Sequence, residues 1–199
     1  KGYGVEVFLR NGYPLDRSDF KGGDVNHTEE VENVSYHFSH VNPDDSTLIN
    51  YQEIYNFNKL NEYQNQAIDY LISNAQKTRP IAIHSASNFV VGLAGARAAK
   101  ALGIPSIYEI RGFWHLTQST KREGYEGSDH YNLSERFEIQ TAKESDYVFT
   151  ITNALKDILI ENGVDESKIS VLPNAVDSSK FGIIPKDTEL EKELGFEGK

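Results

Sequence analysis

Hydrophobic residues along the chain fall into short apolar runs that alternate with longer segments of helical spacing. A run of about four to eight apolar residues between turn residues is typical of a buried strand. Such runs predict strands over residues 5–9, 31–38, 80–83, 104–110, 146–151 and 169–172. Helical spacing predicts helices over residues 47–77, 89–102, 131–144, 155–161 and 189–194, the first with a weak apolar stripe and either kinked or divided near residues 56–58. Strands alternating with helices predict an α/β fold built on a parallel, doubly wound sheet.

Turn and cap residues support these boundaries. Gly103 stops the helix at residues 89–102, and Ser87 or Asn88 can cap its start after a turn at residues 84–87. Thr152 or Asn153 can cap the helix that follows the strand at residues 146–151. The polar segment 115–129 suits a mobile flap over a site.

The stretch 108–114 is the most informative part of the sequence. Glu109 and Arg111 end a buried strand, and Gly112 and the only Trp, Trp114, follow. Alternation along a strand places the acid and the base on the same side, and Gly112 allows a sharp turn. The residues alone leave two interpretations open, an ion pair at a strand end under an aromatic lid, and a binding site.

Polar residues also follow the other predicted strands. Because ligands of open parallel sheets sit beyond the carboxyl ends of the strands, we expect these residues to meet on one rim. Each alone is more often a cap or turn residue, but together they favour a polar cleft for sugar hydroxyls or phosphate oxygens. The rim residues are Arg10, Asn11, His84, Ser85, Glu109, Arg111, Thr152, Asn153 and Asn174.

Composition narrows the function classes. The formal net charge of the 199 residues is −10, which argues against a broad nucleic-acid surface. The chain has no Cys, which excludes disulfides, thiol nucleophiles and Cys-based zinc sites and fits a reducing cytoplasm. No apolar run approaches the ~18 residues of a membrane span, and no signal peptide is visible.

Motifs for cofactors are lacking. The sequence has no Gly-x-Gly-x-x-Gly, no phosphate loop and no Gly-x-Ser-x-Gly elbow. His37 and His40 lie near Asp44 and Asp45, but their spacing matches no metal motif, so we interpret them as exposed loop residues. We therefore expect neither a metal nor a cofactor.

Both ends indicate a piece of a longer protein. The chain begins as if at the tail of a helix, and it stops just after the charged helix predicted at residues 189–194. Residues 178–187 are typical of a linker.

From about Ile81 to Phe181 the sequence resembles the retaining glycosyltransferases of family 4, which have the GT-B fold. The order and spacing of the motifs carry this resemblance. They are His84-Ser85-Ala86-Ser87, Tyr108 to Trp114, Ser145-Asp146 to Leu155, and Ile169 to Asp177, where Pro173-Asn174-Ala175-Val176-Asp177 corresponds to the usual Pro-Asn-Gly-Val-Asp.

The resemblance implies two Rossmann-like domains facing each other across a cleft, one for the acceptor and one for the nucleotide sugar. Residues 1–180 correspond to the amino-terminal acceptor domain without the family's first strand and Gly-rich loop. Residues 181–199 correspond to the interdomain linker and the start of the absent donor domain. The expected partners are a nucleotide-sugar donor and a glycan, polysaccharide or lipid-linked acceptor. The expected location is the cytoplasm, with peripheral contact at the inner face of the membrane for a lipid-linked acceptor.

Many members of the family carry His-Gly where this chain has Arg111-Gly112. A guanidinium stays protonated at neutral pH and cannot act as a base. We interpret Arg111 as a catalytic residue that holds an acceptor phosphate or stabilises charge on the leaving diphosphate. The predicted substrate-binding residues are His84, Ser85, Glu109, Gly112, Trp114, Thr152, Asn153 and Asn174.

Two other functions stay open at this point. A sugar-nucleotide epimerase has a similar two-domain shape, and a non-catalytic sugar-binding subunit could keep the fold without the chemistry. The Pro-Asn-Ala-Val-Asp ending favours a transferase. We also expect that residues 1–199 alone are inactive, because the donor side of the site lies outside them.

Overall fold

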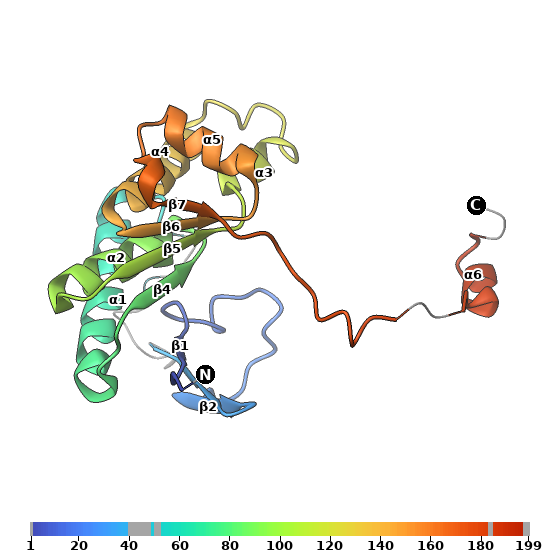
Figure 1. The fold of residues 1–199 in the computed structure, drawn as a ribbon, viewed down its shortest axis with the longest axis horizontal. Coiled ribbons are helices and arrows are strands. Elements are labelled where there is room, and N and C mark those ends of the chain that lie inside the picture. The colour runs from blue at the N-terminus through green and yellow to red at the C-terminus, as the bar shows by residue number, and fades with distance from the viewer. Residues whose placement is uncertain (1, 40–48, 50–52, 183–184, 197–199) are drawn as a thin grey trace.

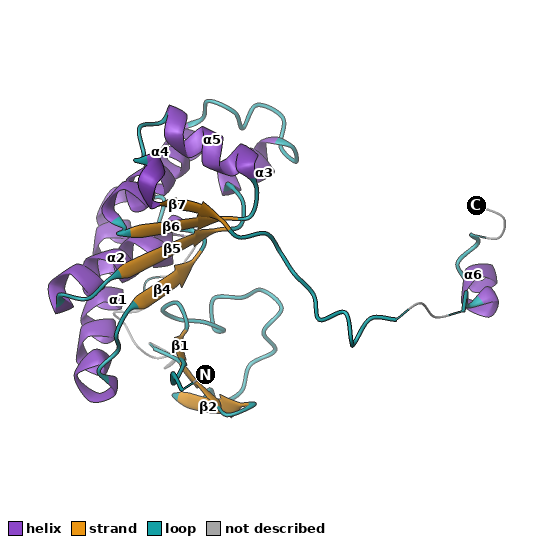
Figure 2. Ribbon diagram, viewed as in Figure 1, coloured by secondary structure: helices purple, strands orange, loops and turns teal. Residues whose placement is uncertain are grey.

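The computed structural model describes residues 2–39, 49, 53–182 and 185–196, and these contain two sheets (Figure 1). The larger sheet is parallel, with the strand order β4-β5-β6-β7. Its strands are β4 (Ile83–Ala86), β5 (Ser106–Ile110), β6 (Tyr147–Thr150) and β7 (Ile169–Val171). They are connected by α2 (Phe89–Leu102), by α4 (Asp129–Glu144), and by α5 (Asn153–Glu161) followed by the 3₁₀ turn η2 (Glu166–Lys168) (Figure 2). The predicted α/β, Rossmann-like class is confirmed.

The two faces of this sheet differ in burial. Along β5, Ser106, Tyr108 and Ile110 are buried, whereas Ile107 and Glu109 are only partly so. The buried side packs on α2 and α4. The packing is close, since a methyl group at Gly92 of α2 would meet the ring of Tyr108 on β5 and the methyl group of Thr141 on α4. Glu109 therefore lies on the more open face of the sheet.

The smaller sheet corrects the prediction of one strand at residues 31–38. That segment is a hairpin of β2 (Thr28–Val31) and β3 (Val34–His37), turning at Glu32 and Asn33, whose φ values are 50° and 62°. Two left-handed residues make the tight turn that antiparallel strands favour, and Asn tolerates that conformation. β1 (Glu6–Phe8) pairs with β3 in parallel, giving the order β1-β3-β2.

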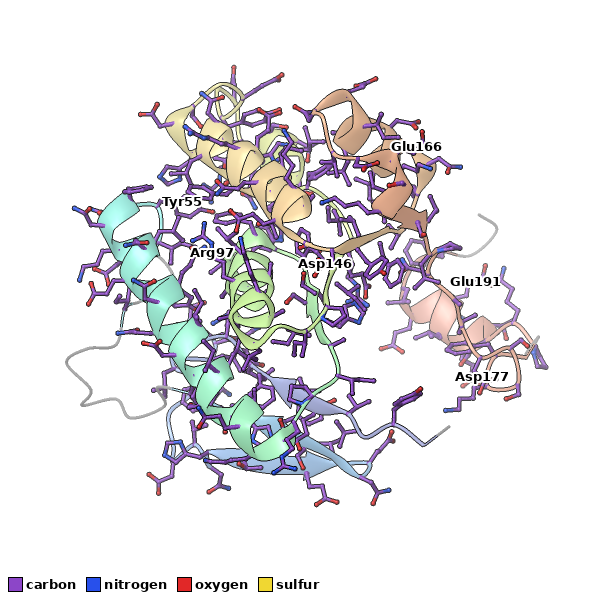
Figure 3. All side chains as sticks on the ribbon, turned by 60° about the vertical axis from the view of Figure 1, so that its left-hand side comes forward. Tyr55, Arg97, Asp146, Glu166, Asp177 and Glu191 are labelled. Atoms are coloured by element: carbon purple, nitrogen blue, oxygen red, sulfur yellow. The ribbon has the colours of Figure 1, made fainter. Side chains whose placement is uncertain are left out.

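Helix α1 (Phe57–Thr78) joins the two sheets. It starts later than predicted, because Asn56 caps its first turn by accepting a hydrogen bond from the Asn58 backbone. Most of residues 47–52 lie outside the described residues. On one side α1 meets the small sheet, where Tyr63 and Asn11 exchange two hydrogen bonds of 3.1 and 3.3 Å. On the other side Arg97 of α2 binds Gln64 of α1 and Glu144 of α4, as Figure 3 places it between α1 and α2.

Two further boundaries differ from the predictions. β4 begins at Ile83, where the prediction had the strand ending, so His84 and Ser85 belong to the strand and not to a turn. Pro80 has no N–H for a ladder and Ile81 is 69% exposed, which explains why pairing starts later. The segment 115–129 is not loop throughout, since Trp114–Ser119 form the short helix α3.

The chain leaves the body after β7. The Leu172 amide still donates a hydrogen bond of 2.7 Å to Thr150 O, and residues 173–182 then run away from the sheets (Figure 1). Helix α6 (Thr188–Glu193) has no buried residue. Among the described residues, no helix has the length and apolarity needed to cross a bilayer.

Candidate functional site

The carboxylate of Glu109 holds two side chains at the end of β5. Its Oε1 accepts a hydrogen bond of 3.0 Å from Arg111 Nε, and its Oε2 lies 3.0 Å from His84 Nε2 on β4. Glu109 is 19% exposed, whereas the Arg111 side chain is 65% exposed. No described residue is hydrogen-bonded to the two Nη groups of Arg111, which leaves them available to a ligand.

A turn after β4 fixes the backbone of Arg111. The Ser87 amide donates to Glu109 O (2.9 Å), and Ser87 Oγ accepts a hydrogen bond of 3.0 Å from the Arg111 amide. Asn88, and not Ser87, caps α2, because Asn88 Oδ1 accepts from the Val90 amide at 3.3 Å. Ser87 therefore bonds the end of β5 and does not cap α2.

Beneath this turn lies the fully buried Glu138 of α4. Its Oε1 accepts a hydrogen bond of 3.0 Å from the Phe89 amide in the first turn of α2, and its Oε2 accepts from Tyr108 OH. Burial raises the pKa of Glu138 to about 7, although both hydrogen bonds act to lower it. Glu138 thus ties α4, β5 and the start of α2 together directly under the Ser87 turn.

A pocket of about 410 Å³ is lined on one side by Ser87, Arg111 and Gly112 and on the other by helix α3. Its contributions, Trp114, Thr117, Gln118 and Lys121, follow the i, i+3, i+4, i+7 spacing of one helix face and its continuation. The lining holds two cations and no carboxylate. The residues that line it are Ser87, Arg111, Gly112, Trp114, Thr117, Gln118 and Lys121.

Sequence reasoning missed four of these residues, and one of them, Ser87, was considered only as a cap candidate. Thr117, Gln118 and Lys121 lie in the segment interpreted as a flap, whose polarity concealed its helical face. The spacing from Trp114 onward was the signal that could have found them.

Gly112 lines the pocket for another reason than predicted. Its φ is not in the left-handed region, so the turn there does not depend on a glycine. A Cβ at Gly112 would meet nothing within 4 Å, which shows that the position opens into the pocket.

His115 anchors α3 from inside. Its side chain is 3% exposed and lies between the rings of Phe113 and Tyr131, with ring centroids 5.4 and 4.9 Å away. Burial lowers its pKa to about 4, so the imidazole is neutral near pH 7. Its Nδ1 is buried without a hydrogen bond in the described part of the chain.

The other predicted site residues lie apart from the pocket. Ser85 packs α2 against the sheet, because a methyl group at Gly95 would lie 2.0 Å from Ser85 Oγ. Thr152 is the N-cap of α5, accepting from the Leu155 amide at 3.3 Å. Asn153 and Asn174 are exposed.

The predicted single rim does not include the first strand. Asn11 is buried in the turn after β1, where it accepts a hydrogen bond of 2.8 Å from Ser39 Oγ, and Arg10 pairs with Asp16. His37 lies 2.9 Å from Glu6, while His40, Asp44 and Asp45 fall outside the described residues. Within residues 2–39 and 53–182, no group of three acidic or His side chains could hold a metal.

Two solved structures share the fold at low sequence identity, and a third gives a TM-score below 0.5. Sucrose-phosphate synthase from Thermosynechococcus elongatus matches with a TM-score of 0.65 and 12% identity over 98% of this chain and 43% of its own. HepE from Anabaena in complex with UDP-glucose gives a TM-score of 0.51 and 16% identity over 66% of this chain and 33% of its own. UDP-GlcNAc 2-epimerase from Neisseria meningitidis, bound to UDP-GlcNAc, gives a TM-score of 0.48 and 17% identity over 80% of this chain and 39% of its own. This chain therefore spans less than half of each of these proteins.

Sequence comparison gives the family. A search of curated protein sequences finds no match. The sequence model of Glycosyltransferase Family 4 matches residues 29–180, about three quarters of the chain. This span contains the Ser87 turn, the β5 end and the α3 wall. The chain belongs to glycosyltransferase family 4.

Proposed function

We propose that the protein is a retaining glycosyltransferase and that residues 1–180 are its acceptor-side domain. The donor is a nucleotide sugar, and the acceptor is a glycan, a polysaccharide or a lipid-linked sugar. The observation that carries the proposal is the pocket at the carboxyl end of β5, where Arg111, Trp114 and Lys121 meet. Cationic and aromatic side chains at that end of a parallel sheet suit a sugar that bears or approaches a phosphate.

The reaction needs few groups from this side of the cleft. An acceptor hydroxyl oxygen forms the new bond to the anomeric carbon, the bond from that carbon to the diphosphate breaks, and the hydroxyl proton passes to an oxygen of the leaving diphosphate. Arg111 holds a phosphate oxygen through its free Nη groups, and Glu109 fixes the guanidinium through Nε at 3.0 Å. In this proposal Arg111 supplies the positive charge, and no metal or further cofactor is required.

The domain assignment has its own support. β4 and β1 each stand at the end of their strand order, so each has an edge without a strand partner among the described residues. We propose that the family's first strand, supplied by sequence that precedes this chain, lies between them. Residues 181–199 then form the linker and the start of the donor domain.

The cellular location follows from the substrates. Nucleotide sugars are proposed to reach the enzyme in the cytoplasm. Contact with the inner face of the membrane is proposed only for a lipid-linked acceptor, beside Trp114 and Leu116, which are 47% and 38% exposed.

One assay tests the reaction type. The full-length protein is incubated with a panel of nucleotide sugars, and released nucleoside diphosphate is measured with and without acceptors. Acceptor-dependent release is expected. Interconversion of the nucleotide sugar without release would indicate an epimerase, and binding of no nucleotide sugar would contradict both.

The Arg111→Ala variant tests the residue. We expect activity to fall by at least ~10²-fold, because a charge that stabilises the reacting phosphate is lost. Arg17→Ala serves as the control, since Arg17 forms an exposed ion pair with Asp19 in a loop of the small sheet. Unchanged turnover of the Arg111 variant would return Arg111 to a structural ion pair.

A further inference from the structure

The charge of the pocket is opposite to that of the chain. The formal net charge is −10, yet the pocket lining holds Arg111 and Lys121 and no carboxylate. Glu109 accepts a hydrogen bond from Nε of Arg111 at 3.0 Å, and no described residue is hydrogen-bonded to the Nη groups. A local positive field in an acidic protein indicates an anionic ligand.

The contacts of Lys121 set it apart from other lysines of the chain. Its side chain makes no ion pair or hydrogen bond with any described residue, whereas Lys168 caps α4 through two hydrogen bonds of 2.8 Å, and Lys156 pairs with Glu166 at 2.9 Å. Lys121 instead reaches the pocket from the end of α3. An ammonium and a guanidinium from two different elements then face one volume.

The remaining lining suits a carbohydrate. Ser87, Thr117 and Gln118 offer hydroxyl and amide groups, and Trp114 offers a half-exposed indole for the apolar face of a sugar ring. A volume of about 410 Å³ is within the usual range of small-ligand sites.

We propose that the acceptor is an anionic sugar, whose phosphate or carboxylate lies between Arg111 and Lys121 and whose ring lies against Trp114. The inference rests on the proposed function and specifies the acceptor class for the same site. Lys121 is then a specificity residue, which favours charged acceptors over neutral ones.

Binding experiments on the full-length protein without nucleotide sugar test the proposal. Glucose, galactose and mannose are each compared with their 6-phosphate and their uronic acid by calorimetry. At least one charged sugar is expected to bind about tenfold or more tightly than its neutral parent. The phosphate and uronate arms separate the two sources of negative charge.

A matched pair of lysine variants isolates the charge. Lys121→Gln is expected to lower the affinity for the charged sugar about tenfold and leave the neutral parent unchanged. Lys100→Gln, at the exposed end of α2, is expected to change neither. Equal binding of charged and neutral sugars, or no binding of any charged sugar at millimolar concentration, would overturn the proposal.

Two outcomes separate this inference from the proposed function. If UDP displaces the charged sugar, the cations serve the donor diphosphate, and the acceptor assignment is wrong while the transferase survives. If charged sugars bind as expected but no nucleotide sugar yields nucleoside diphosphate, the anion site stands and the transferase does not.

Discussion

Two buried ionisable side chains, Glu138 and His115, lie behind the elements that line the pocket, and their pKa values are shifted in opposite directions. Glu138 is kept protonated to a higher pH and His115 is kept neutral to a lower pH, in both cases because burial disfavours the charged form. Their effects on stability have opposite signs over an overlapping pH range. Each must therefore be isolated by its own variant.

Glu138 should make the protein less stable as the pH rises. Its folded pKa of about 7 lies above the ordinary 4.5, so its stabilising effect is full below pH 4.5 and is lost as the pH rises towards 7. The loss is on the order of 3 kcal/mol across this window. Glu138→Gln keeps an acceptor for the Phe89 amide and should remove this loss, which urea unfolding at pH 5, 6, 7 and 8 would measure. An identical pH dependence in both proteins would contradict the assignment.

Acidification should weaken the packing of α3 against the core, because it protonates the buried His115. Its folded pKa of about 4 lies below the ordinary 6.5, so its stabilising effect is present above pH 6.5 and is lost as the pH falls towards 4. Trp114, the neighbouring residue, reports this through its fluorescence. We expect an emission change between pH 6.5 and 4 that His115→Phe abolishes and His27→Gln, at an exposed position, retains. A change that persists in His115→Phe would assign it to another group.

The site residues show how far side-chain chemistry is readable from sequence. Glu109 lies in the last part of β5, Arg111 and Trp114 follow it, and strand-end position alone brings Arg111 and Trp114 to the pocket. His84 and Ser85 occupy adjacent positions in β4, and alternation sends His84 to Glu109 and Ser85 to Gly95 of α2. The strand boundary, predicted three residues too early, decided their orientation. Thr152 was correctly predicted as a cap candidate.

At the scale of elements, α2 lies close to the sheet because its glycines leave room for side chains. A methyl group at Gly92 would lie 2.4 Å from Tyr108 Cε2 and 2.7 Å from Thr141 Cγ2, and Tyr108 is held by Glu138. Gly92→Ala is expected to destabilise the fold by about 1–3 kcal/mol through overpacking, despite the better helix propensity of Ala. Thermal unfolding measures this, with Gly112→Ala as the stability control, since Gly112 faces open space. Equal melting temperatures for the two variants would contradict the close packing.

Elements were predictable where periodicity was strong and misplaced where polarity concealed it. The small-residue helix at 89–102 matches α2, because apolar spacing and Gly103 fix both ends. The hairpin β2–β3 was missed, since the turn at Glu32 and Asn33 lacks the glycine that usually marks such turns. Helix α3 was missed because only His115 on its buried side enters the core, leaving one apolar contact to signal a helix.

The whole molecule has an unequal distribution of apolar surface. Phe181, Leu190 and Leu194 are 69%, 48% and 56% exposed, and they lie in the segment that leaves the body after β7 (Figure 1). Local contacts hold this segment, such as the Lys186–Glu191 ion pair, and the Asp187 carboxylate caps α6. Exposed apolar side chains along one segment are typical of a surface that packs against another domain.

If a donor domain covers this segment in the full-length protein, its cleavage by trypsin will depend on that domain. Residues 1–199 alone should be cut rapidly at Lys186 and Lys192, because the surrounding backbone is exposed and α6 buries no residue. In the full-length protein, cleavage at both sites should slow by at least ~10-fold, because burial requires local opening first. Lys143, in the last turn of α4 against the core, is the internal control and should be cut slowly in both. Equal rates at Lys186 and Lys192 in the two proteins would contradict the proposed packing of residues 181–199 on a second domain.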